Sequence, residues 1–143
     1  MALIRANTSG GGGGGTEIPL WALEPSTATS FTGATVNISQ SYTNFSKIRF
    51  YYKGYGDTAS NEYYTEYPKE TIDEWRRDNE AVGTGLSKIE GGLCCRYSNN
   101  NWSRVIFRGE TGTQSFYIAD CQRLNNNSTN NNLVVPSRIT GIS

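Results

Sequence analysis

The sequence predicts an all-β protein, an antiparallel, jelly-roll-like β-sandwich with a flexible N-terminal arm. Aromatic residues make up 12% of the 143 residues, nine of them Tyr, whereas charged residues make up 18%. Tyr and Thr favour strands, and the 16 Gly with many Asn and Ser provide frequent turns. Short stretches in which apolar and polar residues alternate recur along the chain. The length suits a single two-layer domain.

The first 15 residues differ in composition from the domain that we expect at residues 16–143. Residues 1–9 are mildly apolar, and residues 10–15 are all glycine. Polyglycine buries no side chain and loses much backbone entropy on ordering, so it forms no stable element by itself. It is either a disordered start or a tether through which Leu3, Ile4 and Arg5 dock into a neighbouring subunit.

In the N-terminal half, strands are expected at residues 18–21, 31–39 and 47–52. The clearest is the third, in which Ile48, Phe50 and Tyr52 face one way and the residues between them face the other. Residues 54–67 are expected to form a long excursion with weak strand character. Residues 68–81 have a narrow apolar stripe, Ile72 and Trp75, and predict a polar loop with at most a short helix.

In the C-terminal half, strands are expected at residues 87–89, 93–97, 102–108 and 115–123, and two extended pieces in residues 133–142. Pro136 separates those two pieces. Residues 98–101 are expected to be a hairpin loop and residues 125–132 an Asn-rich loop. Some seven or eight short strands with close spacing predict neighbours joined by hairpins.

The three cysteines, Cys94, Cys95 and Cys121, are expected to be reduced thiols. Neighbouring side chains of a strand point to opposite faces, so Cys94 and Cys95 cannot both line one core. An odd number of Cys without a secretory signal argues against a disulfide framework. Because the chain has no His, three Cys make a poor zinc site, and we predict no metal and no cofactor.

Charge and hydropathy argue against nucleic acid and membranes as partners. A formal net charge of zero gives no electrostatic reason to expect nucleic acid or an anionic membrane. No segment approaches the roughly 20 apolar residues of a membrane helix, and the apolar start is too short for a secretory signal. We therefore expect no nucleic-acid partner, no membrane insertion and assembly in a cytoplasm.

The absence of His removes the usual general base, so Ser-His and Cys-His catalysis is excluded. Carboxylates that could form the pair of a glycan hydrolase cluster in one segment, at Glu62, Glu66, Glu70, Asp73 and Glu74. The same segment holds Lys69, Arg76 and Arg77, so a solvated mixed-charge surface explains it without catalysis. We expect no enzyme and no catalytic residues.

Tyrosines also gather in this region, and Tyr55, Tyr63, Tyr64 and Tyr67 are the candidate glycan or partner surface. An exposed Tyr offers a rigid apolar face and a hydroxyl, which suit stacking on a sugar ring or anchoring an interface. The alternative is ordinary core and cross-strand packing.

The two ends of the chain carry a recognisable pattern. The start reads ALIRANTSGGGGGG, a strand with Trp21 follows, and then FTGATVNISQSYTNFSKIRFYY. The end reads LVVPSRITGIS, with a Pro, a basic residue and Ile-x-Gly-Ile at Pro136, Arg138, Ile139, Gly141 and Ile142. These segments, about half of the chain, resemble small tail-fibre or minor structural proteins of phages and prophages. Residues 54–92 lie outside the resemblance.

The resemblance implies a structural component of a bacteriophage virion, either a tail fibre, a baseplate component or a capsid-decorating protein. It implies anchoring by the N-terminal arm, a β-domain presented outward for host attachment, and localisation in the virion after assembly in the bacterial cytoplasm. The implied partners are other virion proteins and further copies in a homotrimer. A host cell-surface glycan is a further expected partner, through Tyr and Asn surfaces. The alternatives are a stand-alone glycan-binding module and, less favoured, a carboxylate-based glycan hydrolase.

Overall fold

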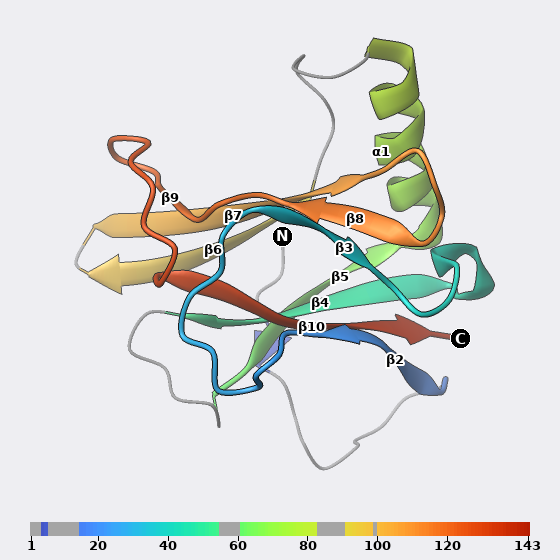
Figure 1. Cartoon of the computed structure of the whole chain (residues 1–143), viewed down its shortest axis with the longest axis horizontal. Coiled ribbons are helices and arrows are strands. Elements are labelled where there is room, and N and C mark those ends of the chain that lie inside the picture. The colour runs from blue at the N-terminus through green and yellow to red at the C-terminus, as the bar shows by residue number, and fades with distance from the viewer. Residues whose placement is uncertain (1–3, 6–14, 55–60, 83–90, 99) are drawn as a thin grey trace.

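The computed structural model, shown in Figure 1, describes residues 4, 5, 15–54, 61–82, 91–98 and 100–143. Two antiparallel sheets pack face to face and one α-helix lies beside them, so the predicted all-β sandwich is confirmed. In Figure 1 the strands β6, β7 and β8, drawn in yellow and orange, lie above β4, β10 and β2, drawn in green, red and blue. Among the described residues, no helix is long and apolar enough to cross a membrane.

The lower sheet, sheet A, has the strand order β1-β5-β4-β10-β2. Its strands are β1 (Ile4–Arg5), β2 (Glu17–Ala22), β4 (Lys47–Gly54), β5 (Tyr63–Pro68) and β10 (Val134–Ile142). The upper sheet, sheet B, has the order β3-β8-β7-β6, and β9 pairs with β7. Its strands are β3 (Ala34–Asn37), β6 (Gly91–Ser98), β7 (Asn101–Gly109), β8 (Ser115–Ile118) and β9 (Gln122–Arg123).

The core between the sheets is centred on Phe50 of β4. Its ring stacks on Phe107 of β7 at 4.2 Å between centroids and meets Phe116 of β8 edge-on at 5.2 Å. All three rings have no exposed surface. Gly141 of β10 completes the packing because a β-carbon there would clash with the Phe45 ring. These contacts join the two sheets through aromatic side chains from non-adjacent parts of the sequence.

The expectation of a polar loop with at most a short helix in residues 68–81 is wrong: the structure has a 14-residue helix, α1 (Lys69–Val82). Ile72 and Trp75 are both buried, and the Trp75 ring lies 4.9 Å from that of Tyr67. The N-terminus of the helix is held by the Lys69 amide, which donates to the Ser46 carbonyl at 3.0 Å. A narrow apolar stripe is sufficient because it reaches the core, where the Trp75 ring lies 6.4 Å from that of Phe50. The helix itself lies at the right of Figure 1.

The weak strand character expected for residues 54–67 is wrong for residues 63–67, because β5 pairs along its length with β4 inside sheet A. Residues 55–60 lie outside the described residues. Thr65 is buried, and Tyr63 and Tyr67 pack against the core, whereas Tyr64 and Glu66 alternate with them. Tyr67 also closes one side of the sandwich, since its hydroxyl donates to the Gly92 carbonyl and accepts from the Gly92 amide. Tyr hides this alternation in the sequence because it suits either face.

Two strands expected in the C-terminal half differ from the structure in their extent. The single strand expected at residues 115–123 is broken into β8 and β9, and between them Asp120 accepts a hydrogen bond from the Gly33 amide at 2.7 Å. The two pieces expected around Pro136 are one strand, β10, with a register shift after Pro136 that accommodates the missing amide hydrogen. Residues 87–89 lie outside the described residues.

The cysteines alternate as predicted. Cys95 is buried in the core and Cys94 is half-buried, which places the two neighbours on opposite faces of β6. Cys121 is buried as well. Burial raises the pKa of the Cys94 and Cys121 thiols above the ordinary value, which favours the protonated, unreactive form.

Candidate functional site

The outer face of sheet A, which points away from the core, carries a connected set of polar side chains. We call it the outer network; its members are Glu17, Lys47, Arg49, Tyr51, Tyr64, Glu66 and Thr140. They come from β2, β4, β5 and β10. Strand alternation explains the arrangement, because residues that flank Ile48, Phe50 and Tyr52 must point outward.

Ion pairs link three strands across this face. The Arg49 Nε donates to Glu66 Oε2 at 2.8 Å, and Lys47 Nζ donates to the other Glu66 oxygen at 3.1 Å. A second guanidinium nitrogen of Arg49, Nη1, donates to Glu17 Oε2 at 3.3 Å. The guanidinium also lies 4.6 Å from the centroid of the Tyr64 ring. Arg49 therefore stands between two carboxylates and an aromatic face.

Tyr51 is buried within the outer network, with 3% of its surface exposed. Its hydroxyl donates to Glu17, and Thr140 Oγ1 donates to the same Glu17 oxygen at 2.8 Å. The Arg138 guanidinium carbon lies 3.7 Å from the centroid of the Tyr51 ring. Tyr51 is thus enclosed by its neighbours, whereas Glu17 and Lys47 at the edges of the outer network stay partly exposed to solvent.

The electrostatics follow from these contacts. Burial acts to raise the pKa of Glu17, but hydrogen bonds from Tyr51 and Thr140 and the charge of Arg49 outweigh it and hold this pKa below the ordinary value. Burial likewise acts to raise the pKa of Glu66, and Arg49 and Lys47 together lower it below the ordinary value. Both carboxylates are ionised at neutral pH.

A pocket of about 290 Å³ opens at one end of the same face. We call it the Lys53 pocket; it is lined by Ala22, Leu23, Ser26, Ala28, Lys53, Glu62, Val135, Ser137 and Arg138. These residues come from the end of β2, the loop that follows it, the end of β4, the position just before β5 and the first half of β10. Val135 lies directly opposite Lys53 in the register, so both belong to the outer face.

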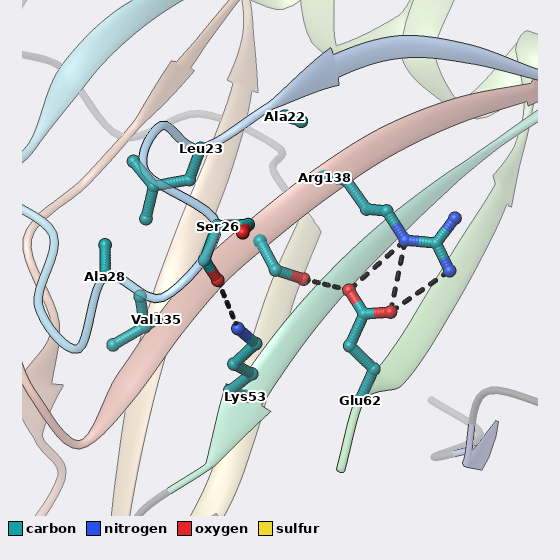
Figure 2. Close-up of a pocket in the computed structure, with 9 residues that line it drawn as sticks. Ala22, Leu23, Ser26, Ala28, Lys53, Glu62, Val135 and Arg138 are labelled. Carbon is teal, nitrogen blue, oxygen red and sulfur yellow. Dashed lines mark hydrogen bonds and ion pairs between the residues drawn. The ribbon is translucent and has the colours of Figure 1, made fainter. Parts of the chain in front are cut away.

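Figure 2 shows the polar groups of the Lys53 pocket. The Glu62 carboxylate accepts from Ser137 Oγ at 2.5 Å and from Arg138 Nε at 3.1 Å. An ion pair of 3.1 Å between Arg138 and Glu62 accompanies them. Lys53 points the other way, toward Ser26, and its Nζ donates to the Ser26 carbonyl at 2.9 Å. Leu23, Ala28 and Val135 provide the apolar part of the wall.

Lys53 differs from the other lysines of the described chain. Lys47 pairs with Glu66 at 3.1 Å and Lys69 pairs with Asp73 at 3.3 Å. Lys53 has no carboxylate within ion-pair distance in the described residues, and its one hydrogen bond there goes to a neutral carbonyl. An ammonium carries three donors, so two remain for a ligand. Since Glu62 and Arg138 neutralise each other, the pocket has a net positive charge.

The structure does not gather the candidate tyrosines on one face. Tyr63 and Tyr67 pack against the core, where Tyr63 lies 5.9 Å from the Tyr52 ring. Tyr64 faces outward and lies 5.3 Å from the Tyr51 ring. Tyr55 falls outside the described residues. Of the candidate tyrosines that the structure describes, Tyr64 is the one that faces outward, and it already belongs to the outer network.

The acidic segment is likewise dispersed over different contacts. Glu62 is bound by Arg138, and Glu66 is bound by Arg49 and Lys47. Glu70 and Glu74 are exposed on α1. Asp73 accepts from the Tyr42 hydroxyl at 2.7 Å. Among the described residues, no three Cys, Asp or Glu side chains come together as a set that could hold a metal ion.

The arm residues have different positions relative to the described chain. Leu3 lies outside it, whereas Ile4 and Arg5 form β1, which pairs antiparallel with the edge of β5. In this register Ile4 is opposite Tyr64 and Arg5 is opposite Tyr63. The arm thus adds a short strand to sheet A.

Comparisons with protein-family models and with curated proteins find no match to this chain. The resemblance of its ends to phage structural proteins therefore stays a prediction.

The sequence did not reveal the Lys53 pocket. Lys53 continues the outward alternation of Lys47, Arg49 and Tyr51, which was its one available signal. Its partners in the pocket lie far away in the sequence, from residue 22 to residue 138, and only the register of β4, β10 and β2 brings them together.

Proposed function

We propose that this chain is a structural component of a bacteriophage virion, anchored by its N-terminal arm and presenting its β-sandwich outward for host attachment. The observation that carries the proposal is β1, a strand contributed by the arm to the open edge of β5. Strand addition to a sheet edge relies on main-chain hydrogen bonds and is a common mode of protein assembly.

The glycine run makes the same pairing available between copies. Residues 6–16 separate β1 from β2 and include the glycines 10–15. An extended chain of this length reaches on the order of 35–40 Å, enough to span a small domain. The arm of one copy is therefore long enough to pair with β5 of a neighbour in a homotrimer, or with another virion protein.

The state of the carboxylates supports a structural role over hydrolysis of glycans. A glycosidase needs one carboxylic acid whose pKa is raised so that it can donate a proton. The pKa values of Glu66 and Asp73 are held below their ordinary values, and Glu62 is bound by a guanidinium. We therefore propose that the protein is not an enzyme.

The arm is tested by deleting residues 2–5 in the phage genome and measuring the amount of this chain in purified particles by quantitative mass spectrometry. The matched control combines Ala6→Gly, Asn7→Ser and Thr8→Gly, which keeps the arm length and leaves β1 intact. We expect the deletion to abolish incorporation and the control to preserve it, while both variants remain folded. Normal incorporation of the deletion variant would refute anchoring by the arm.

A stand-alone glycan-binding module is the second candidate, and the Lys53 pocket favours it. The two candidates separate in a cell lysate: a virion protein sediments with particles, whereas a free module stays in the supernatant. A reducing-sugar assay on host envelope polysaccharide addresses the hydrolase alternative. Activity that disappears when Glu62, Glu66 and Glu70 are all changed to Gln would contradict the non-enzymatic role.

A further inference from the structure

We infer that the Lys53 pocket binds an acidic sugar residue, a pyranose that carries a carboxylate, through Lys53. This inference names the ligand of the proposed host-attachment role and in that respect rests on it. Three features of the pocket carry it: its charge, its size and its division into a polar and an apolar side.

The charge comes first. In the described chain, Lys53 is the lysine without a carboxylate partner, and it stands at the pocket wall with spare donors. The Glu62–Arg138 pair contributes no net charge. A ligand with one carboxylate would therefore neutralise the pocket, with a charge-assisted hydrogen bond from Lys53. A second negative charge would approach Glu62 and be disfavoured.

The size limits the ligand to a single compact unit. At about 290 Å³, the pocket has the space of about ten water molecules and lies at the lower end of ligand-binding pockets. This space suits one pyranose ring with its substituents. A long acyl chain would need a deeper apolar cavity, and a peptide would need a longer groove.

The two sides of the pocket match the two sides of a sugar. Leu23, Ala28 and Val135 offer apolar contact, which suits the C–H face of a pyranose ring. On the polar side, Glu62 and Ser137 lie with Arg138 and are fixed by their mutual hydrogen bonds. An ionised carboxylate has about four acceptor positions, so Glu62 retains capacity for a sugar hydroxyl.

This site differs from the tyrosine surface that the sequence suggested. It uses hydrogen bonds and one charge where the tyrosine surface would use ring stacking. Its specificity therefore depends on the acidic group, since a neutral sugar would offer the Lys53 ammonium no negative charge to pair with.

The experiment is a titration of the full-length protein followed by NMR of the backbone amides. The probe is methyl β-D-glucuronide, and the controls are methyl β-D-glucoside, which lacks the charge, and acetate, which lacks the ring. We expect the glucuronide to shift amides around Lys53, Ser26 and Ser137 with a Kd on the order of 1 mM, as small polar ligands give. The glucoside and acetate should each bind at least about tenfold more weakly.

Two variants of Lys53 and one matched control test whether glucuronide binding depends on this residue. Lys53→Met should weaken glucuronide binding about tenfold, whereas Lys53→Arg should retain most of it. Lys47→Met on the same strand, outside the pocket, should leave binding unchanged. Equal affinity for glucuronide and glucoside, equal affinity for acetate, or unchanged binding in Lys53→Met would each overturn the inference.

The inference and the proposed function fail in different ways. If glucuronide does not bind but the protein is incorporated into particles through its arm, only the acidic-sugar inference is lost. If the protein binds glucuronide but is absent from particles, the site stands and the virion role is lost.

Discussion

Phe50 and Tyr51 are neighbours on β4, and both are buried, with 0% and 3% of their surfaces exposed. Phe50 is buried by aromatic rings of the opposite sheet, whereas Tyr51 is buried by charged and polar side chains on the outer face. The difference shows that burial alone does not identify the core of this protein. One face of β4 joins the sheets, and the other carries a polar surface that ends in the Lys53 pocket.

Two parts of the outer face, the outer network and the Lys53 pocket, also differ from each other. In the outer network, Arg49 forms ion pairs with both Glu17 and Glu66. At the Lys53 pocket, a cation retains unused donors. Mutations in the core, in the outer network and in the pocket should therefore have three separable effects on stability and binding.

The largest expected effect is that of Phe50→Ala. Removing a fully buried ring leaves a cavity between the sheets and should lower the free energy of unfolding by about 3–5 kcal/mol. Urea denaturation measures the change, with Leu124→Ala, at an exposed position, as the control within about 0.5 kcal/mol. A loss below that of the outer-network variants would contradict the assignment of the core.

Arg49→Met should have a smaller effect. It retains most of the aliphatic stem but leaves Glu17 and Glu66 without their shared cation, so we expect a loss of about 1–2 kcal/mol. The measurement is urea denaturation at low and at high salt. If the loss is the same as that of an exposed arginine such as Arg77→Met, the outer network does not act as a unit.

The outer network also predicts a pH dependence. The pKa values of Glu17 and Glu66 are lower in the folded state than the unfolded value of about 4.3. Their contribution is therefore complete above that value and is lost as the pH falls through the folded pKa. We expect stability to fall below about pH 4, and the fall to be shallower in a Glu17→Gln, Glu66→Gln variant. An unchanged pH profile in the double variant would exclude these groups as its source.

The smallest effect on stability is expected for Lys53→Met, which should change the free energy of unfolding by less than about 0.5 kcal/mol. The side chain contributes one hydrogen bond to a carbonyl and no ion pair among the described residues. Thermal unfolding of the variant beside that of the unmodified chain measures this. A loss as large as that of Arg49→Met would make Lys53 a structural residue and weaken its assignment to a ligand.

These two faces also explain how far the sequence could be interpreted. The alternation in residues 47–52 was visible because Ile and Phe mark one face and Lys and Arg mark the other. It was hidden in β5 because Tyr63, Tyr64 and Tyr67 occur on both faces. The helix α1 was underestimated because two apolar side chains, Ile72 and Trp75, suffice when both are buried and Trp75 packs against core rings.

The site was harder to predict than the fold for a physical reason. The acidic segment suggested carboxylate chemistry, but the cations that bind Glu62 and Glu66 come from β10 and β4. Long-range register decides such partners, and local sequence does not encode it. The Lys53 pocket arises in the same way, from the loop after β2 and from β10.

The central claim is that this chain is part of a phage particle. The most direct measurement is immunogold labelling of purified, intact particles by electron microscopy with an antibody against the β-sandwich. We predict label at a defined position on the particle: at the tail tip or fibres for an adhesin, or over the capsid for a decorating protein. Particles without label, together with free protein in the supernatant, would contradict the claim.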